Sequence, residues 1–446
     1  DTTDPDAIAE QAANLDLAKT LFIVSTKSGG TVETISFFKY FYNQLAAALD
    51  GGDPGSHFIA ITDAGSQLDQ IAAQYNFRRT FHNDPNIGGR YSALSYFGLV
   101  PAALIGVDLG KLLESAMVMD RSKAAFLGAV MGELAQDGRD KLTLLVSPAV
   151  ASFGSWVEQL IAESTGKDGH GILPVVGEPV NQASYYGDDR LFVYLKLKRD
   201  IYYDDLAADL EQSGYPVIHM QMDDEYDLGE QMFLWELATA VAGTRLEINP
   251  FDQPNVESAK VLARQMVSTY QERGELPTQK ASQEFDGISV YPDQAGKIEG
   301  TASARQVIDR FLAEPKPGAY IALQAYIQPT PETDQLLQAL RAQLRDETRL
   351  ATSLGYGPRF LHSTGQLHKG DAGNGMFIQL TSDAVLHIPI PDQPGSDQSG
   401  ISFGVLKQAQ ALGDRQALLD TDRRVLRLHL GQDPIRSLKS LIEAGN

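Results

Sequence analysis

Residues 20–34 read TLFIVSTKSGGTVET: an apolar run, hydroxyl side chains around a lysine, two glycines and the start of a helical pattern. An apolar strand that passes through a tight turn into a helix is typical of α/β folds. At such a turn, backbone N–H groups point outward and the helix dipole is positive, while Gly29 and Gly30 let the backbone approach a ligand. The stretch therefore predicts an anion site. The alternative is an ordinary helix start capped by Ser28 or Thr31.

Side chains in this turn could strengthen an anion site. Ser25, Thr26, Ser28 and Thr31 offer hydroxyl donors, and Lys27 offers a point charge. The turn differs from the GxxxxGK[ST] phosphate loop because Lys27 precedes the glycines, and it is not GxGxxG either. The ligand expected here is an anion held by a loop of another type.

Strand-like and helical runs alternate through the first 250 residues. Besides TLFIVST, the runs HFIAITD, KLTLLVSPAV, RLFVYLKL and PVIHMQM read as strands, and segments such as 31–48 read as helices. This alternation predicts mainly parallel sheets covered by helices on both faces. The apolar-periodic stretch 95–136 reads as helical and separates two such units. The chain is therefore predicted to contain a first αβα domain at 1–135 and a second at 136–273.

A polar stretch rich in turn-forming residues, 274–286, reads as a linker or surface loop. Beyond it the βα pattern restarts with a helix at 303–314, a strand at 319–327 and a helix at 331–349. We therefore predict a smaller αβ domain at 287–446.

Composition limits the function. With 446 residues and 43% hydrophobic residues the chain can bury several cores, and its net charge of −21 disfavours nucleic acid or an anionic membrane as a partner. The absence of cysteine excludes disulfides, thiolate metal sites and cysteine nucleophiles, and the eight histidines show no metal-ligand spacing. No apolar run reaches membrane-spanning length and no leader pattern occurs, so a cytoplasmic protein is expected.

Three later stretches carry candidate chemistry. NIGGRYS places Arg90 after paired glycines, where it could stabilise an oxyanion or could be a surface residue packed on Tyr91. ESTGK places Glu163 at the end of an apolar helix, where a partly desolvated carboxylate can act as a base, although most such glutamates are simply solvated. INPFDQPNVESAK places Lys260 on a helix after a proline-containing turn.

In this order and at these separations, the four motifs resemble those of the glucose-6-phosphate isomerase family, over roughly residues 1–265. The later segment GYGPRFLHSTGQLHKGD, at 355–371, is similar to the C-terminal part of the isomerase module in transaldolase/glucose-6-phosphate isomerase fusion proteins. Because DTTDPDAI reads as the inside of a domain, the expectation is an N-terminally truncated module of that type, with an upstream transaldolase domain as one option.

The resemblance implies two sugar-isomerase αβα sandwich domains, in addition to the smaller C-terminal αβ domain. It implies an aldose–ketose isomerase that interconverts glucose 6-phosphate and fructose 6-phosphate through a cis-enediol(ate), without metal or organic cofactor. Glu163 matches the base, Arg90 the group that stabilises the enediolate, and Lys260 a lysine at the ring-opening end. The resemblance assigns the phosphate to Thr26, Lys27, Ser28, Thr31 and Thr34, and substrate binding to Gly89.

Two departures from the family pattern stand out. The family's ring-opening histidine is missing, because Glu230 and Gln231 stand where it would fall. His362 and His368 are the candidates to replace it, with His170 a weaker one, and each could instead be a hydrogen-bonded structural histidine. The family's upstream glycine- and serine-rich sugar-binding loop is also missing from this sequence.

Other functions remain open. A sugar-phosphate-binding regulatory module, or a structural part of a fusion enzyme, would lack turnover on its own. The joint presence of Glu163, Arg90 and Lys260 favours the enzyme, because a sensor needs no proton-abstracting carboxylate. A homodimer and a monomer both fit the resemblance.

Overall fold

A computed structural model describes residues 2–277, 279–292 and 300–443. The predicted linker at 274–286 and the C-terminal domain at 287–446 therefore lie partly outside the described residues. The chain forms two compact units, each built from several segments. The first unit comprises residues 1–119, 228–233 and 386–406, and the second comprises 120–227, 234–385 and 407–446.

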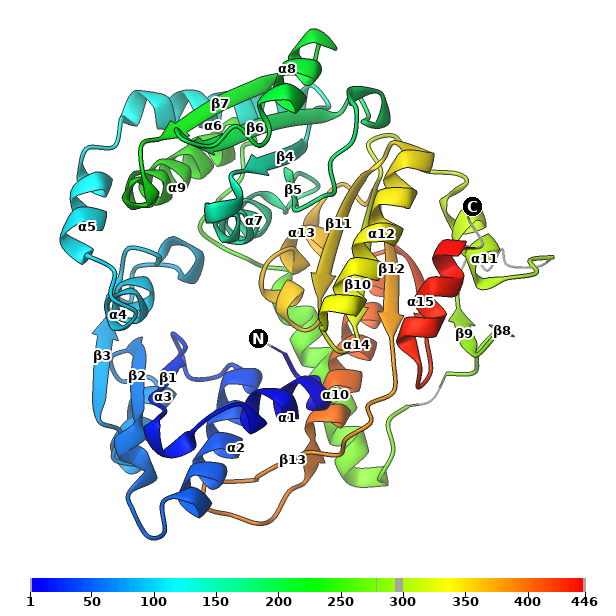
Figure 1. The fold of residues 1–446 in the computed structure, drawn as a ribbon. Coiled ribbons are helices and arrows are strands. Elements are labelled where there is room, and N and C mark those ends of the chain that lie inside the picture. The colour runs from blue at the N-terminus through cyan, green and yellow to red at the C-terminus, as the bar shows by residue number, and fades with distance from the viewer. Residues whose placement is uncertain (1, 278, 293–299, 444–446) are drawn as a thin grey trace. The chain divides into compact units, whose positions relative to one another are not determined.

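The first unit contains a three-stranded parallel sheet in the order β1-β2-β3 (Figure 1). Strand β2 is buried along most of its length, as expected for a parallel strand covered on both faces. Phe38 and Leu45, from the helix that follows β1, pack with Phe58 in the core. The strands are β1 (Phe22–Ser25), β2 (Phe58–Asp63) and β3 (Arg79–Asn83), and the helices are α1 (Pro5–Ala13), α2 (Val32–Ala48), α3 (Gln67–Gln74), α4 (Tyr96–Leu104) and α5 (Leu109–Met117).

A segment from far along the chain completes this unit. Residues 386–406 carry the short antiparallel pair β13 (Pro389–Ile390) and β14 (Ile401–Ser402). Asn43 of α2 donates to Ser396 O at 2.8 Å and accepts from Gly395 N at 2.6 Å. We call residues 386–406 the strap, because they cover α2 although they follow it by more than 300 residues.

The second unit contains a four-stranded parallel sheet in the order β5-β4-β6-β7. Every residue of β4 is buried, which fits its central position. The strands are β4 (Lys141–Val146), β5 (Leu173–Val176), β6 (Arg190–Leu197) and β7 (Val217–Met222), and the helices are α6 (Arg121–Gln136), α7 (Ser152–Thr165), α8 (Asp204–Gln212) and α9 (Leu228–Arg245), the first turn of which belongs to the first unit.

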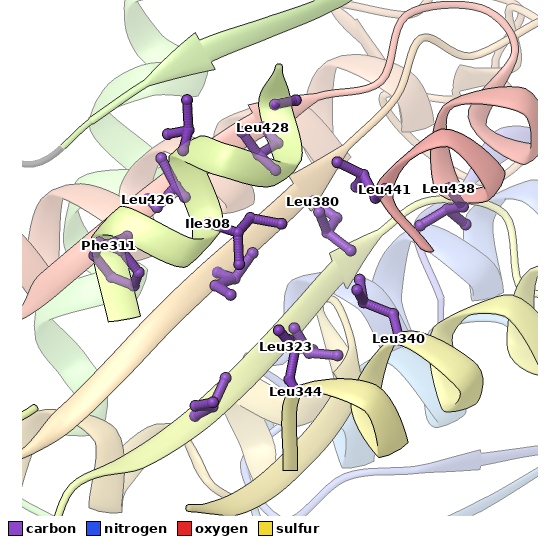
Figure 2. Close-up of a cluster of buried hydrophobic side chains, with 14 of the residues drawn as sticks. Ile308, Phe311, Leu323, Leu340, Leu344, Leu380, Leu426, Leu428, Leu438 and Leu441 are labelled. Carbon is purple, nitrogen blue, oxygen red and sulfur yellow. The ribbon is translucent and has the colours of Figure 1, made fainter. Parts of the chain in front are cut away.

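The same unit contains a mixed sheet in the order β11-β10-β12-β15-β9-β8. Strand β9 runs antiparallel to both of its neighbours, β15 and β8. Figure 2 shows its core, where Leu323 and Leu380 from the strands meet Leu340 and Leu344 from α12. The strands are β8 (Gln283–Phe285), β9 (Ile288–Tyr291), β10 (Tyr320–Tyr326), β11 (Ala351–Tyr356), β12 (Gly375–Thr381) and β15 (Arg424–His429). The helices are α10 (Val256–Arg273), α11 (Ala304–Leu312), α12 (Pro331–Thr348), α13 (Gly365–Gly370), α14 (Phe403–Asp420), the first turn of which belongs to the first unit, and α15 (Pro434–Glu443).

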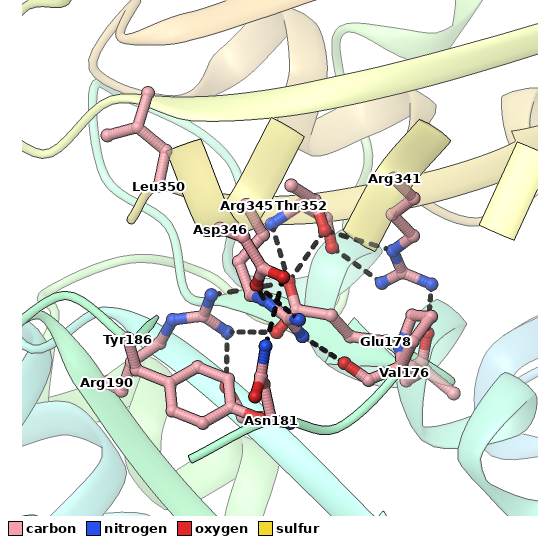
Figure 3. A network of polar contacts seen from close by, with 12 residues as sticks. Val176, Glu178, Asn181, Tyr186, Arg190, Arg341, Arg345, Asp346, Leu350 and Thr352 are labelled. Atoms are coloured by element: carbon pink, nitrogen blue, oxygen red, sulfur yellow. Dashed lines mark hydrogen bonds and ion pairs between the residues drawn. The ribbon is translucent and has the colours of Figure 1, made fainter. Parts of the chain in front are cut away.

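A buried charge network joins the two sheets of the second unit (Figure 3). Glu178, next to β5, accepts from Arg190 at 3.0 and 3.3 Å and from the Thr352 hydroxyl at 2.6 Å. Arg341 of α12 donates to Thr352 O at 2.6 Å and to Val176 O at 3.0 Å. Burial alone would raise the pKa of Glu178, but the charges of Arg190 and Arg341 outweigh it and lower that pKa.

The predicted α/β class with mainly parallel sheets is confirmed. The predicted helices at 31–48, 303–314 and 331–349 correspond to α2, α11 and α12. Each predicted domain contains one large sheet, but most of residues 136–273 and 287–446 lie in one compact unit, so the domain boundaries stay a prediction. In the described part of the chain, no helix is long and apolar enough to span a bilayer.

Candidate functional site

The turn after β1 has the geometry of an anion site. Thr31 stands at the N-cap of α2, but its side chain makes no capping hydrogen bond, so the alternative of a helix start capped by Thr31 does not form. The Ser28 hydroxyl accepts instead from Gly30 N at 3.2 Å, and the hydroxyls of Thr26 and Thr31 lie 3.1 Å apart. Backbone N–H groups and hydroxyls are therefore gathered where the positive end of the α2 dipole lies. Thr34 lies half-buried in the first turn of α2.

Close packing fixes the path of this turn. Gly29 has φ +79°, and a Cβ there would lie 2.3 Å from the Leu68 backbone nitrogen. Gln67 N donates to Ser28 O at 3.1 Å. The start of α3 therefore holds the turn in place, and only glycine fits at position 29.

Lys27 connects the turn to the end of β2 and to the loop after β3. Its ammonium forms a 2.7 Å ion pair with Asp63 at the end of β2 and donates to Pro85 O at 2.9 Å. The point charge expected from the sequence is thus already compensated by a carboxylate. A role of Lys27 in phosphate binding stays a prediction.

Arg90 is buried, with 4% of its surface exposed. It lies in the short 3₁₀ helix Gly89–Tyr91, and its guanidinium carbon lies 5.4 Å from the centre of the Tyr91 ring. The sequence allowed Arg90 to be a surface residue packed on Tyr91. The arginine does pack on Tyr91, but it is buried. Gly89 before it is exposed, and nothing lies within 4 Å of where its Cβ would be.

Glu163 lies in the last turn of α7, half-buried, and accepts a hydrogen bond from Gln159 at 3.3 Å. Helix α7 ends two residues later, and Gly166 N still bonds to Ala162 O at 3.1 Å. Because the hydrogen-bonding pattern runs through this end, the backbone of Glu163 is rigidly connected to the turn that follows.

Lys167 ties this turn to the loop before α10. It is 1% exposed and donates to Asn249 O at 2.7 Å and to the Asp252 carboxylate at 2.8 Å, and it also bonds the Asp252 carbonyl. The ESTGK and INPFDQPN motifs are therefore in direct contact. Sequence reasoning missed this role, and the one signal was a lysine in a turn between glycines.

Lys260 lies in the second turn of α10 and is exposed. Among the described residues it makes no hydrogen bond or ion pair. Its ammonium is therefore available to a ligand.

The segment 362–370 packs directly against the ESTGK turn. A Cβ on Gly166 would lie 2.2 Å from Leu367 Cα, and a Cβ on Gly370 would lie 2.4 Å from Gly166 O. Gly169 N donates to Gly370 O at 3.0 Å. The segment that carries His362 and His368 thus contacts the turn that follows Glu163.

His368 is 2% exposed and lies among aromatic rings, the nearest of which is Phe377 at 4.9 Å between centroids. Its Nδ1 lies 3.4 Å from Gln324 Nε2, and its Nε2 is buried without a hydrogen-bond partner among the described residues. Burial, with the charges of Lys369 and Arg423, lowers the pKa of His368 well below its ordinary value, so the ring is neutral.

A small cavity adjoins His368 and is lined also by Glu158, Gln324, Ser353 and Thr364. Burial raises the pKa of Glu158, against the opposing effects of the Ser363 hydrogen bond and nearby arginines. His362 is half-buried and His170 is exposed. A ring-opening role for His362 or His368 stays a prediction.

The candidate residues divide between the two units. The predicted phosphate-binding residues at 26–34, Gly89 and Arg90 belong to the first unit, and Glu163, Lys260, His362 and His368 belong to the second. In the parts of the chain that the structure describes, no three histidine, aspartate or glutamate side chains are grouped to hold a metal ion.

Parallel sheets with helices between their strands, and a glycine-containing strand-to-helix turn after β1, define an α/β protein. The family model described as phosphoglucose isomerase matches residues 1–135. A probable glucose-6-phosphate isomerase from Methanococcus maripaludis is 30% identical over 314 residues, which span 60% of this chain and 70% of that relative. The chain belongs to the glucose-6-phosphate isomerase family.

Other relatives agree with this family. The glucose-6-phosphate isomerase of Prochlorococcus marinus MIT 9313 is 30% identical over 371 residues, covering 72% of this chain and 66% of the relative. That of Streptococcus pyogenes MGAS10750 is 28% identical over 285 residues, covering 53% of this chain and 64% of the relative. The chain thus spans about two thirds of the length of these relatives. These matches do not bear on a transaldolase fusion or a truncated start, which stay predictions.

Among solved structures, a hypothetical protein from Thermus thermophilus is similar with a TM-score of 0.52 and 26% identity. The similarity covers 59% of this chain and 75% of that chain. It supports the α/β fold over a little more than half of this chain.

Proposed function

We propose that the chain interconverts glucose 6-phosphate and fructose 6-phosphate, a step of glycolysis and gluconeogenesis. The observation that carries the proposal is the uncapped start of α2 with its hydroxyls, in a chain of this family. Backbone N–H groups of α2 and the hydroxyls of Ser28 and Thr31 would bind the phosphate. Such a turn suits a phosphate better than a neutral sugar, because the helix dipole favours a negative charge.

Glu163 is the proposed base. It would take the proton from C2 of the open-chain aldose, the C2–H electron pair would form the C1–C2 double bond, and the carbonyl electron pair would move onto O1 to give the enediolate. Transfer of the O2 proton to O1 and return of the proton from Glu163 to C1 would then give the ketose. Arg90 would stabilise the negative charge on the enediolate oxygens, and the exposed ammonium of Lys260 would assist at the ring-opening end.

The test is exchange of the C2 proton of glucose 6-phosphate into deuterated water, with fructose 6-phosphate followed in the same sample. Glu163→Gln should lower both by about 10²–10⁴-fold, the range expected for loss of a general base. The matched control is Glu211→Gln, which removes an exposed glutamate that pairs with His219. Equal loss of exchange in both variants would count against Glu163 as the base.

A second measurement examines the phosphate loop. Replacing Ser28 and Thr31 together by Ala should weaken binding of glucitol 6-phosphate, which has no carbonyl, by at least about tenfold, because two bonds to a charged group are lost. Ser56→Ala, in a distant turn of the same unit, is the control. Unchanged affinity in the double variant would move the phosphate site elsewhere. Binding without turnover in the unaltered chain would instead support the regulatory or structural module.

A further inference from the structure

One buried amide connects three segments that lie far apart in the sequence. Gln366 of α13 is 0% exposed. Its Nε2 donates to Gly166 O at 2.8 Å and to Asn255 Oδ1 at 2.7 Å, and its Oε1 accepts from Asn255 N at 2.8 Å. Both N–H groups and the oxygen of this amide are therefore used, all on the ESTGK turn and the start of α10.

The two ends of this link are close in sequence to the proposed reacting groups. Gly166 follows Glu163 by three residues, and the hydrogen bond from Gly166 N to Ala162 O continues the pattern of α7. Asn255 is the N-cap of α10 and precedes Lys260 by five residues. Because Gly166 is the C-cap of α7 and Asn255 the N-cap of α10, a shift at Gly166 or Asn255 displaces Glu163 or Lys260 with it.

The Asn255 side chain binds Gln366 and does not cap its own helix. Asparagine at an N-cap ordinarily bonds to backbone N–H groups of the first helical turn. Here the Asn255 side chain makes no such capping bond and accepts from Gln366 instead. Helix α13 packs so closely against the turn that neither Gly166 nor Gly370 has room for a Cβ.

We propose that Gln366 is a positioning residue, which sets the base Glu163 relative to the helix that carries Lys260. This inference rests on the proposed isomerase function. Gln366 does not act on the substrate itself. It fixes the distance between two groups that do, and a misplacement of about 1 Å in such a pair can cost about 10²-fold in rate.

The test compares Gln366→Met with the matched control Gln379→Met. Both remove a fully buried amide, but the hydrogen bond of Gln379, in β12, goes to Ala411 O of α14 and to none of the three segments. We expect kcat for fructose 6-phosphate to fall about 10–100-fold in Gln366→Met with KM changed less than about twofold. Gln379→Met should keep kcat per folded molecule.

A double-mutant cycle separates positioning from general damage. Asn255→Leu removes one of the two acceptors of Gln366 and should lower kcat in the same way. If the two residues act as one link, the double variant should be hardly worse than either single variant. Independent losses that multiply, or an unchanged kcat in Gln366→Met, would overturn the proposal.

Hydrogen–deuterium exchange on the same variants gives a readout without turnover. Gln366→Met should speed exchange in residues 163–170 and 255–262, and Gln379→Met should not. If the unaltered chain shows no isomerase activity, the proposed function fails, and exchange then decides whether Gln366 holds these segments. Unchanged exchange in Gln366→Met would refute the link in either case.

Discussion

Replacing Lys167 by Met should destabilise the second unit through the bonds that its ammonium makes. Met keeps much of the side-chain volume but leaves Asn249 O and Asp252 O without their donor. The Asp252 carboxylate is 54% exposed and can recover water, so it adds little to the loss. Two part-buried hydrogen bonds from a charged donor are lost, at about 1.5–3 kcal/mol each. Offset by release from burying an ammonium, this gives a loss of about 2–4 kcal/mol in the free energy of unfolding.

Thermal and urea unfolding measure this loss. At roughly 2 °C per kcal/mol for a unit of this size, Tm should fall by about 4–8 °C. Lys198→Met is the control, because Lys198 is 65% exposed and its partner Asp223 is 73% exposed, so that ion pair should contribute little. Equal Tm values for the two variants would refute the view that Lys167 holds the two motifs together.

Three further substitutions test other features. Burial raises the pKa of Glu236 from 4.5 to about 8, so its contribution to stability is present below pH 4.5 and is lost as the pH rises to about 8. Urea unfolding at pH 5 and pH 9 should therefore differ by up to a few kcal/mol in the unaltered chain, and Glu236→Gln should remove this difference. Glu178, with a lowered pKa, contributes stability that is present above pH 4.5 and lost at lower pH, so Glu178→Gln should unfold more easily at pH 7, by about 3 kcal/mol, yet lose less stability on acidification. Gly29→Ala should weaken phosphate binding, whereas Gly106→Ala, also at positive φ but with nothing within 4 Å, should only lower stability slightly, as calorimetry would show. Flat pH dependence in the unaltered chain, or equal phosphate affinity in the two glycine variants, would contradict these expectations.

Local patterns predicted much of the fold and little of the site's architecture. The apolar run and glycine turn of residues 20–34 identified β1, the turn and α2, because strand, turn and helix signals lie within one short window. The links made by Lys167 and Gln366 could not be predicted in this way. Their hydrogen bonds join residues 82 to 200 positions apart and leave no periodic trace in the sequence.

The burial of individual charged groups was equally hidden. From the sequence, Arg90 could be either a surface residue or a group that stabilises an oxyanion, and only the structure shows that it is buried. The return of residues 386–406 to the first unit was not predicted, because β13 and β14 have two residues each and the segment otherwise reads as a polar loop. Short strands of this kind carry no hydrophobic period to detect.

The strap has a consequence for how the protein is made. Helix α2 and the turn before it precede the second unit in the sequence, but Phe403, whose ring stacks on Phe37 at 5.6 Å, is synthesised nearly 370 residues after Phe37. On the ribosome, α2 must therefore wait with one face uncovered while almost the whole of the second unit emerges. A fragment that stops before residue 386 would contain every residue of the phosphate loop and still lack the cover of its helix.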